Sequence, residues 1–286
     1  GVLTLAAMLV VRFVVPDPQA SHFHSDAEAT PARLREVLAN VQLLRLNFGI
    51  FALHAAQMAM FVVVPFALVQ AGGLETSDHW QVYLPIMVAS FACMVPAIIY
   101  GEKHGHLKRV FVVSIALMLA AQLLFASSIQ QFWGIVISLT LYFIAFNVLE
   151  ASLPSIISKI APAASKGTAI GVYNTSQSLG AFLGGISGGW LSHNYGFASV
   201  FVFCSVLIAL WLLFAISMKA PPAVKSRMFH LEGMSADAGS RLAERLAALN
   251  GVREAVVLAD EGVALLKVDM HAWDEQAALE MIKRGI

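Results

Sequence analysis

Charged residues and cysteines are scarce in this sequence. Only 13% of its 286 residues are charged and the formal net charge is zero, whereas a soluble domain carries about 25% charged residues. This composition excludes a basic nucleic-acid-binding protein and a disordered chain. The two cysteines, Cys93 and Cys204, lie far apart within apolar runs, which excludes a disulfide scaffold and a CxxC metal or redox pair.

Hydrophobic residues, by contrast, make up 58% of the chain and gather in long runs. The hydrocarbon core of a bilayer is about 30 Å thick and needs roughly 20 apolar residues in a helix. Six stretches reach that length: about 49–71, 80–100, 110–129, 132–158, 167–191 and 197–218. The sequence therefore predicts a multi-pass protein embedded in the lipid bilayer.

Residues 1–15 are apolar but too short for a span, and they lack the charged start of a signal peptide. We interpret them as the end of a transmembrane helix that begins before this sequence. Residues 16–47 are expected to form a linker with an amphipathic helix, because Thr30-Pro31 suits a helix start. The linker histidines His22 and His24 are more typical of solvated side chains than of metal ligands.

The 18 Lys and Arg residues predict the orientation of the spans. The connections 72–79, 130–131 and 192–196 contain none of them, whereas the alternate connections and the segment after residue 218 contain all of them. Because basic connections stay on the cytoplasmic side, the C-terminal segment is expected in the cytoplasm.

Residues 219–286 have the composition of a soluble domain. Strand-like runs and helical patterns alternate in the order β-α-β-β-α, which predicts a small α+β ferredoxin-like domain (βαββαβ) without its last strand. The loop 232–237 contains no cysteine or histidine, so no soft-metal site is expected there. We interpret the domain as an interaction or regulatory module and expect neither a metal nor a cofactor.

Glu150 is the one Asp, Glu, Lys or Arg within the six stretches. A carboxylate at that depth is tolerated when it faces a water-filled cavity, is paired or is protonated. Asn147 lies three residues earlier on the same helix face, and His54 and Gln57 form a second polar pair. Since the charge of histidine changes near neutral pH, we predict that these four residues couple protons or line a substrate cavity. Structural hydrogen bonding between helices is the alternative.

Glycines mark the stretch 167–191. Gly171, Gly180, Gly184 and Gly188 are candidates for a flat helix face, because glycines four residues apart let another helix backbone approach closely. Such a face serves static packing or the sliding that alternating access requires, and the sequence leaves both open.

The segments FNVLEASLPSIISKIAP (146–162) and KGTAIGVYNTSQSLGAFLGGISGGWL (166–191), with the turn GEKHGHLKR (101–109) and the appended tail, resemble the major facilitator superfamily, in particular its YajR-type members. The resemblance implies an all-α bundle in which 48–218 is the C-terminal six-helix half of a twelve-helix fold. Residues 1–15 would end helix six, and an N-terminal half would be missing from this sequence.

The same resemblance implies roles for the polar residues. Helices seven and ten line the central cavity in this family, and they correspond to the spans with His54 and Glu150. The turn corresponds to a loop motif of which Gly101 is kept, whereas Glu102 and Lys103 depart from it. Family members are mostly proton-driven antiporters of drugs or sugars, so we expect a secondary transporter of a bacterial inner membrane that exchanges protons for a small organic solute.

A membrane-anchored sensor that signals through its cytoplasmic domain is the alternative, and it requires a partner for the tail rather than a second helical half. An enzyme is disfavoured because no nucleophile–base pair or phosphate-binding loop is visible, and metal export is disfavoured by the missing cysteine ligands.

Overall fold

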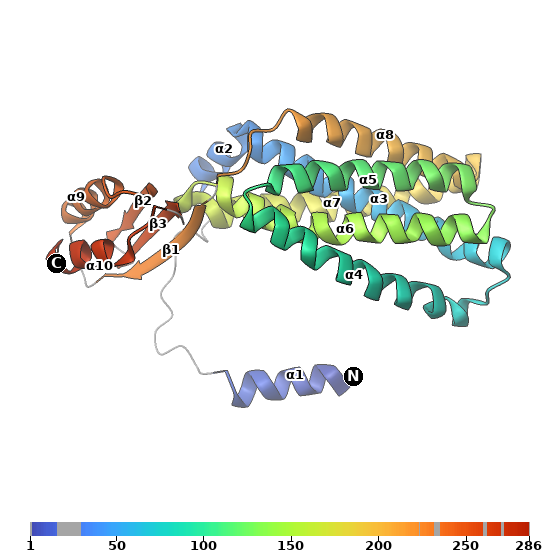
Figure 1. Cartoon of the computed structure of the whole chain (residues 1–286), viewed down its shortest axis with the longest axis horizontal. Coiled ribbons are helices and arrows are strands. Elements are labelled where there is room, and N and C mark those ends of the chain that lie inside the picture. The colour runs from blue at the N-terminus through green and yellow to red at the C-terminus, as the bar shows by residue number, and fades with distance from the viewer. Residues whose placement is uncertain are drawn as a thin grey trace.

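The computed structural model describes residues 2–15, 30–222, 224–231, 235–259, 262–269 and 272–285 (Figure 1). The histidines of the linker, His22 and His24, lie outside the described residues, and so do Glu232–Met234 of the loop considered for metal binding.

Six long helices form a bundle: α3 (Val41–Gly72), α4 (Trp80–Lys103), α5 (Leu107–Ser128), α6 (Phe132–Ile160), α7 (Lys166–Tyr195) and α8 (Phe197–Ile216). Among the described residues, five helices are long and apolar enough to cross a membrane: α3, α4 with the short turn before it, α5, α6 and α8. The remaining helix, α7, has 30 residues and is long enough to cross a membrane. Its glycines and polar residues make it less hydrophobic than the other five.

The expected amphipathic helix over 30–46 is divided in two. Thr30 caps α2 (Pro31–Ala39) by accepting a hydrogen bond from the Arg33 amide. The side chain of Asn40 then accepts hydrogen bonds from the amides of Gln42 and Leu43 and starts α3. The helix of the first span therefore begins at Val41 rather than near residue 48, because Asn40 ends one helix and caps the start of the next.

Helix α1 (Val2–Phe13) is apolar and 12 residues long, and none of its described side chains is buried. It lies apart from the bundle in Figure 1, joined through the linker. Twelve residues are too few for a full span.

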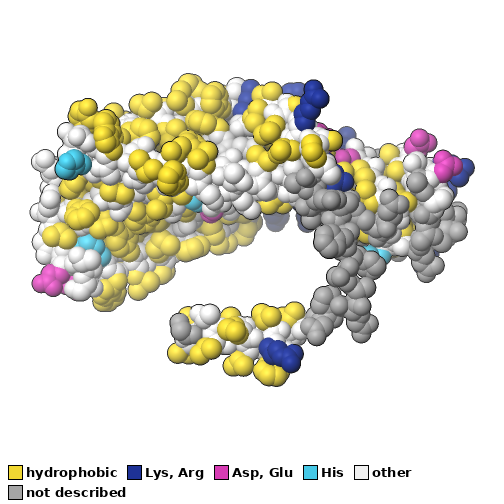
Figure 2. All heavy atoms as spheres, turned by 180° about the vertical axis from the view of Figure 1, so that it is seen from behind, with side chains coloured by type: hydrophobic (Ala, Val, Ile, Leu, Met, Phe, Trp, Pro, Cys, Tyr) yellow, Lys and Arg dark blue, Asp and Glu magenta, His cyan; other side chains and the backbone are white. Residues whose placement is uncertain are grey.

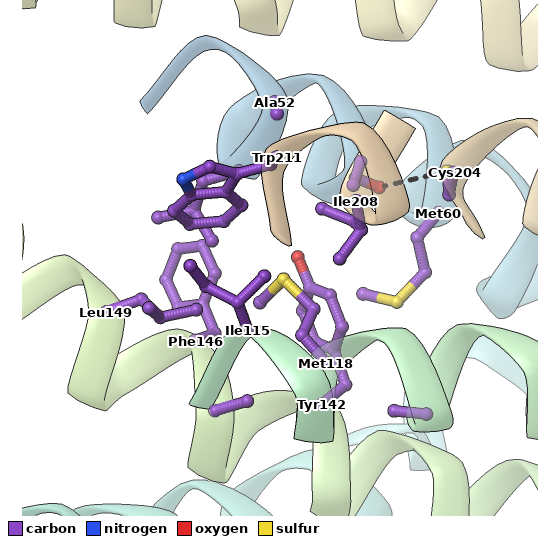
Figure 3. Packing of buried hydrophobic residues seen from close by; sticks show 14 of the residues in the cluster. Ala52, Met60, Ile115, Met118, Tyr142, Phe146, Leu149, Cys204, Ile208 and Trp211 are labelled. Carbon is purple, nitrogen blue, oxygen red and sulfur yellow. Dashed lines mark hydrogen bonds between the residues drawn. The ribbon is translucent and has the colours of Figure 1, made fainter. Parts of the chain in front are cut away.

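Large side chains from four helices fill the centre of the bundle. Trp211 of α8 and Tyr142 of α6 are fully buried, and they share one hydrophobic cluster with Met60 of α3 and Met118 of α5 (Figure 3). Hydrophobic side chains also cover the outside of the bundle in Figure 2. Helices that pack on one another and also face lipid are expected to carry apolar side chains both in the centre of the bundle and on its outer surface.

Helix α7 packs more extensively on α3 than any other two elements pack on each other, and glycines make this possible. A Cβ atom at Gly180 or Gly184 would overlap the carbonyl oxygens of Phe51 and Ala55, and one at Gly188 would lie 2.6 Å from the Ala59 Cα. The expected flat face thus rests on α3. Around Gly171, no atom described in the structure lies within 4 Å of such a Cβ.

The tail domain, residues 224–285, consists of β1 (Val224–His230), α9 (Ala236–Ala247), β2 (Val252–Leu258), β3 (Val263–Asp269) and α10 (Glu275–Gly285). Strands β1 and β2 both pair antiparallel with β3, giving the order β1-β3-β2. They are therefore parallel to each other with one strand between them, as in the split βαβ arrangement. The fold class is as predicted: a mostly helical membrane bundle followed by a small α+β domain.

The sheet of the tail domain contacts the turn between α6 and α7. Lys267 of β3 is only 5% exposed. Its Nζ forms an ion pair with Glu254 of β2 at 3.1 Å and donates a hydrogen bond to the carbonyl of Ala161. Glu254 in turn accepts a hydrogen bond from the Ala163 amide at 2.9 Å. The tail domain is thus joined to the bundle by buried polar contacts as well as by the chain.

Candidate functional site

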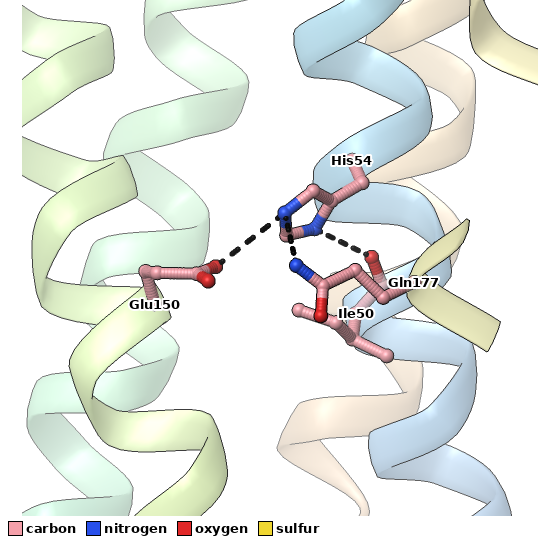
Figure 4. A network of polar contacts seen from close by, with 4 residues as sticks. All are labelled: Ile50, His54, Glu150 and Gln177. Carbon is pink, nitrogen blue, oxygen red and sulfur yellow. Dashed lines mark hydrogen bonds and ion pairs between the residues drawn. The ribbon is translucent and has the colours of Figure 1, made fainter. Parts of the chain in front are cut away.

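Three polar side chains from three helices meet at mid-bundle (Figure 4). His54 Nε2 of α3 lies 3.8 Å from Glu150 Oε2 of α6 and 2.8 Å from Gln177 Nε2 of α7. His54 Nδ1 lies 3.3 Å from the Ile50 carbonyl oxygen, one turn earlier in α3. The structure therefore brings together two of the predicted residues, His54 and Glu150, and adds Gln177.

This geometry defines the hydrogen bonds of a neutral imidazole. A carbonyl only accepts hydrogen bonds, so the proton is on Nδ1, which donates to Ile50, and Nε2 accepts from the Gln177 amide. A proton arriving on Nε2 would turn it into a donor that faces the Glu150 carboxylate. His54 Nε2 thus faces both the Gln177 amide and the Glu150 carboxylate.

The cluster leaves several polar atoms without a hydrogen bond. Among the described residues, no partner is found for Glu150 Oε2 or for the hydroxyl groups of Tyr142 and Tyr173. Buried polar atoms are nearly always paired in folded proteins, so these unpaired atoms of α6 and α7 indicate a place for water, an ion or a polar ligand.

Burial differs between the two principal residues. The Glu150 side chain is 38% exposed, whereas the His54 side chain is 11% exposed, and His54 is covered by the edge of Phe146 with ring centroids 6.0 Å apart. Glu150 is thus open to an approaching solute on the surface of this bundle. His54 lies behind it.

The other two predicted cavity residues do not join this cluster. The Asn147 side-chain amide donates to Ser90 Oγ of α4 at 2.8 Å in a buried contact. For Gln57, no hydrogen bond is found within the described part of the chain. Spacing along the helix predicts a polar pair of His54 with Gln57, whereas the side chain that hydrogen-bonds to His54 is that of Gln177. Helical spacing within one helix could not reveal a contact between helices.

The loop-motif residues have separate roles. Gly101 is buried against Val110 and Leu107, and Lys103 is exposed. Glu102 joins α4 to α6: its Oε2 lies 2.6 Å from Lys159 Nζ, and its Oε1 accepts a hydrogen bond from Ser155. This residue departs from the family motif, yet it connects two helix ends.

No group of three or more His, Cys, Asp or Glu side chains in the described residues could hold a metal ion. Cys93 and Cys204 are both free thiols.

Comparison with known proteins places the chain in a family. The profile of the Major Facilitator Superfamily matches residues 86–251. The chain is 38% identical over 269 residues to "Inner membrane transport protein YajR" of Escherichia coli (strain K12), across 94% of this chain and 59% of that protein. The chain belongs to the major facilitator superfamily. The expected YajR-type resemblance within the superfamily is confirmed.

More distant members of the superfamily are also similar. An uncharacterized transporter of Buchnera aphidicola subsp. Acyrthosiphon pisum is 29% identical over 64% of this chain and 47% of its own length. "Multidrug resistance protein MdtH" of Aeromonas salmonicida is 25% identical over 58% of this chain and 42% of its own length. The chain thus spans between about two fifths and three fifths of the length of these relatives.

Proposed function

We propose that this chain is the C-terminal half of a secondary active transporter of a bacterial inner membrane, which exchanges protons for a small organic solute and exports it. The observation that carries this proposal is the His54–Glu150 pair, in which an imidazole and a carboxylate from facing helices lie 3.8 Å apart. Two ionisable groups at that distance can pass a proton between them through one water or a small rotation.

The proposed coupling assigns a role to each residue of the cluster. Glu150, the more exposed residue, receives the proton or the solute, and His54 accepts the proton and releases Gln177. Gln177 belongs to α7, which rests on α3 through the glycine face. Proton transfer to His54 would therefore change a hydrogen bond between the two helices that pack most closely, as a rocking movement requires.

The names of relatives support the choice of solute class. One is named an inner membrane transport protein and another a multidrug resistance protein. For the present chain, we propose the export of a drug-like or sugar-like solute. A preceding six-helix half would supply the opposite wall of the cavity, and the basic connections favour a cytoplasmic tail domain.

The tail domain is proposed to regulate transport by biasing one bundle conformation. Its sheet holds the turn at Ala161–Ala163 through Glu254 and Lys267, and that turn joins the two helices that carry Glu150 and Gln177. Glu36 of α2 accepts a hydrogen bond from Ser165 in the same connection. Deletion of residues 224–286 from the full-length protein should alter transport, and unchanged rates over a range of pH and ionic strength would contradict regulation.

The transporter proposal is tested in proteoliposomes that contain the full-length protein and a trapped pH dye. A panel of cationic drugs and sugars is added outside, with wild type, Glu150→Gln and Gln57→Leu compared. Substrate-dependent proton movement that is lost in Glu150→Gln and kept in Gln57→Leu is the expected result. Proton movement that survives Glu150→Gln would show that Glu150 has only a structural role.

The membrane sensor remains the second candidate because the tail domain has its own hydrophobic core and meets the bundle at α6 and the α6–α7 turn. It predicts no solute-driven proton movement in that assay and a cytoplasmic partner that binds residues 224–286. A preceding helical half that resembles this one would favour the transporter instead.

A further inference from the structure

A second candidate site lies on the outside of the bundle, away from Glu150. A groove of about 380 Å³ runs between the start of α5 and the end of α8, which is within the range of small-molecule sites. Its lining combines basic side chains with apolar ones: His106, Lys108, Arg109, Val112, Val113 and Ile216. No carboxylate is among the described residues that line it.

The basic side chains gather at the end of the bundle that faces the tail. Lys108 Nζ donates to the Ile216 carbonyl at 3.0 Å, and Arg45 of α3 donates to the neighbouring Ser217 carbonyl at 2.8 Å. Figure 2 shows Lys and Arg at the end of the bundle nearest the tail domain. Arg109 is exposed, and no hydrogen bond or ion pair to it is found among the described residues.

The apolar side of the groove is open to the surroundings. Val113 is 60% exposed and Ile216 is 55% exposed, on helices that are apolar enough to cross a membrane. A ligand that fills the groove must therefore place a negative charge beside Arg109 and a hydrocarbon chain along Val113 and Ile216. A free anion would leave the apolar walls uncovered, and a neutral lipid would leave the cations unpaired.

We propose that this groove binds an anionic phospholipid, with the phosphate beside Arg109 and Lys108 and one acyl chain over Val113 and Ile216. Basic pockets between transmembrane helices near the headgroup region recognise such lipids. The start of α5 adds its unpaired amides and the positive end of its dipole to the same region. The proposal depends on the chain lying in a membrane and not on what it transports.

The test measures lipid binding by native mass spectrometry of the full-length protein, purified in detergent and stripped of lipid. Phosphatidylglycerol and phosphatidylcholine are titrated separately, each with and without millimolar inorganic phosphate. Wild type should retain phosphatidylglycerol in preference to phosphatidylcholine, and inorganic phosphate should not displace it. Arg109→Gln should weaken binding about fivefold, the effect of one basic charge near an anionic lipid.

Lys103→Gln is the matched control, because Lys103 is an exposed cation of the same turn that does not line the groove. It should bind phosphatidylglycerol as the wild type does. Arg109 is exposed and its replacement should leave the thermal unfolding unchanged, which separates lost binding from lost folding. Equal binding of both lipids, displacement by inorganic phosphate, or wild-type affinity in Arg109→Gln would each overturn the proposal.

Discussion

Helix α6 carries two polar clusters that differ in how completely their atoms are paired. At its last turns, Lys159 and Ser155 bind Glu102, and the following turn binds Glu254 and Lys267 of the tail domain. At its middle, Glu150 Oε2 has no hydrogen bond among the described residues and lies 3.8 Å from His54. A fully paired cluster resists change, whereas an incompletely paired one is ready to accept a proton or a ligand.

This difference separates a structural region from a functional one on the same helix. Pairing at the helix end fixes the positions of α4, α6 and the tail relative to one another. The cluster at mid-bundle places a carboxylate inside a membrane helix, which costs stability, and one oxygen of that carboxylate has no hydrogen bond among the described residues. Proteins retain such destabilising groups where function requires them. The following variants test the contrast.

The largest effect is expected from Gly184→Leu, which alters the scaffold of the mid-bundle cluster. A side chain at this position would overlap the backbone of Ala55 and separate α7 from α3, so we expect a loss of about 3 kcal/mol or more. Gly185→Leu is the control, because a Cβ at Gly185 meets no described atom within 4 Å. Thermal unfolding of both variants in detergent measures the difference, and equal stability would show that the glycine face is not tightly packed.

Lys267→Met removes the buried cation that holds the α6–α7 turn to the tail. Glu254 and the Ala161 carbonyl would lose a partner, at a cost of about 1–3 kcal/mol. Amide hydrogen exchange at residues 161–165 should therefore accelerate about tenfold or more. Lys225→Met, at an exposed position of β1, should leave this exchange unchanged. Protection that survives Lys267→Met would mean that the tail does not hold the turn.

Gln177→Leu removes the hydrogen bond that His54 Nε2 accepts. The loss of one buried hydrogen bond is worth about 1 kcal/mol, so solute-driven proton movement should slow about fivefold. Gln57→Leu, whose amide has no partner among the described residues, should transport as the wild type. Equal rates of proton movement for the two variants would remove Gln177 from the mechanism.

The smallest effect is expected from Arg241→Ala in the tail domain. Arg241 and Asp237 form an exposed ion pair at 3.2 Å, with side chains 71% and 86% exposed. Because exposed pairs contribute little, the free energy of unfolding should change by less than about 0.5 kcal/mol. A loss comparable with that of Lys267→Met would show that burial does not set the value of these contacts.

The fold was largely predictable because its signals are local. Apolar runs identify the membrane helices, and alternating patterns with a hairpin identify the tail domain. The exception is the start of the first span, where Asn40 ends one helix and begins another. Apolar spacing continues across that cap, so the pattern predicted a single helix.

The candidate site was predictable only in part. Glu150 and His54 were found because an ionisable residue in an apolar span requires an explanation. Gln177 was not assigned to the site, and Asn147 turned out to contact Ser90, because partners across helices depend on rotation about each helix axis. The spacing of residues within one span does not reveal how that span is rotated relative to its neighbours.

The most direct test compares Glu150→Gln with Glu102→Gln in the full-length protein, with solute-driven proton movement and thermal unfolding measured on the same preparations. Both changes remove one carboxylate near α6. We expect Glu150→Gln to lower proton movement about a hundredfold, as for a lost proton-transfer group, without lowering stability. Glu102→Gln should retain transport within about twofold, because Glu102 belongs to the paired cluster at the end of α6 and has no contact with the mid-bundle cluster. Normal proton movement in Glu150→Gln would contradict the central claim that the incompletely paired cluster carries the function.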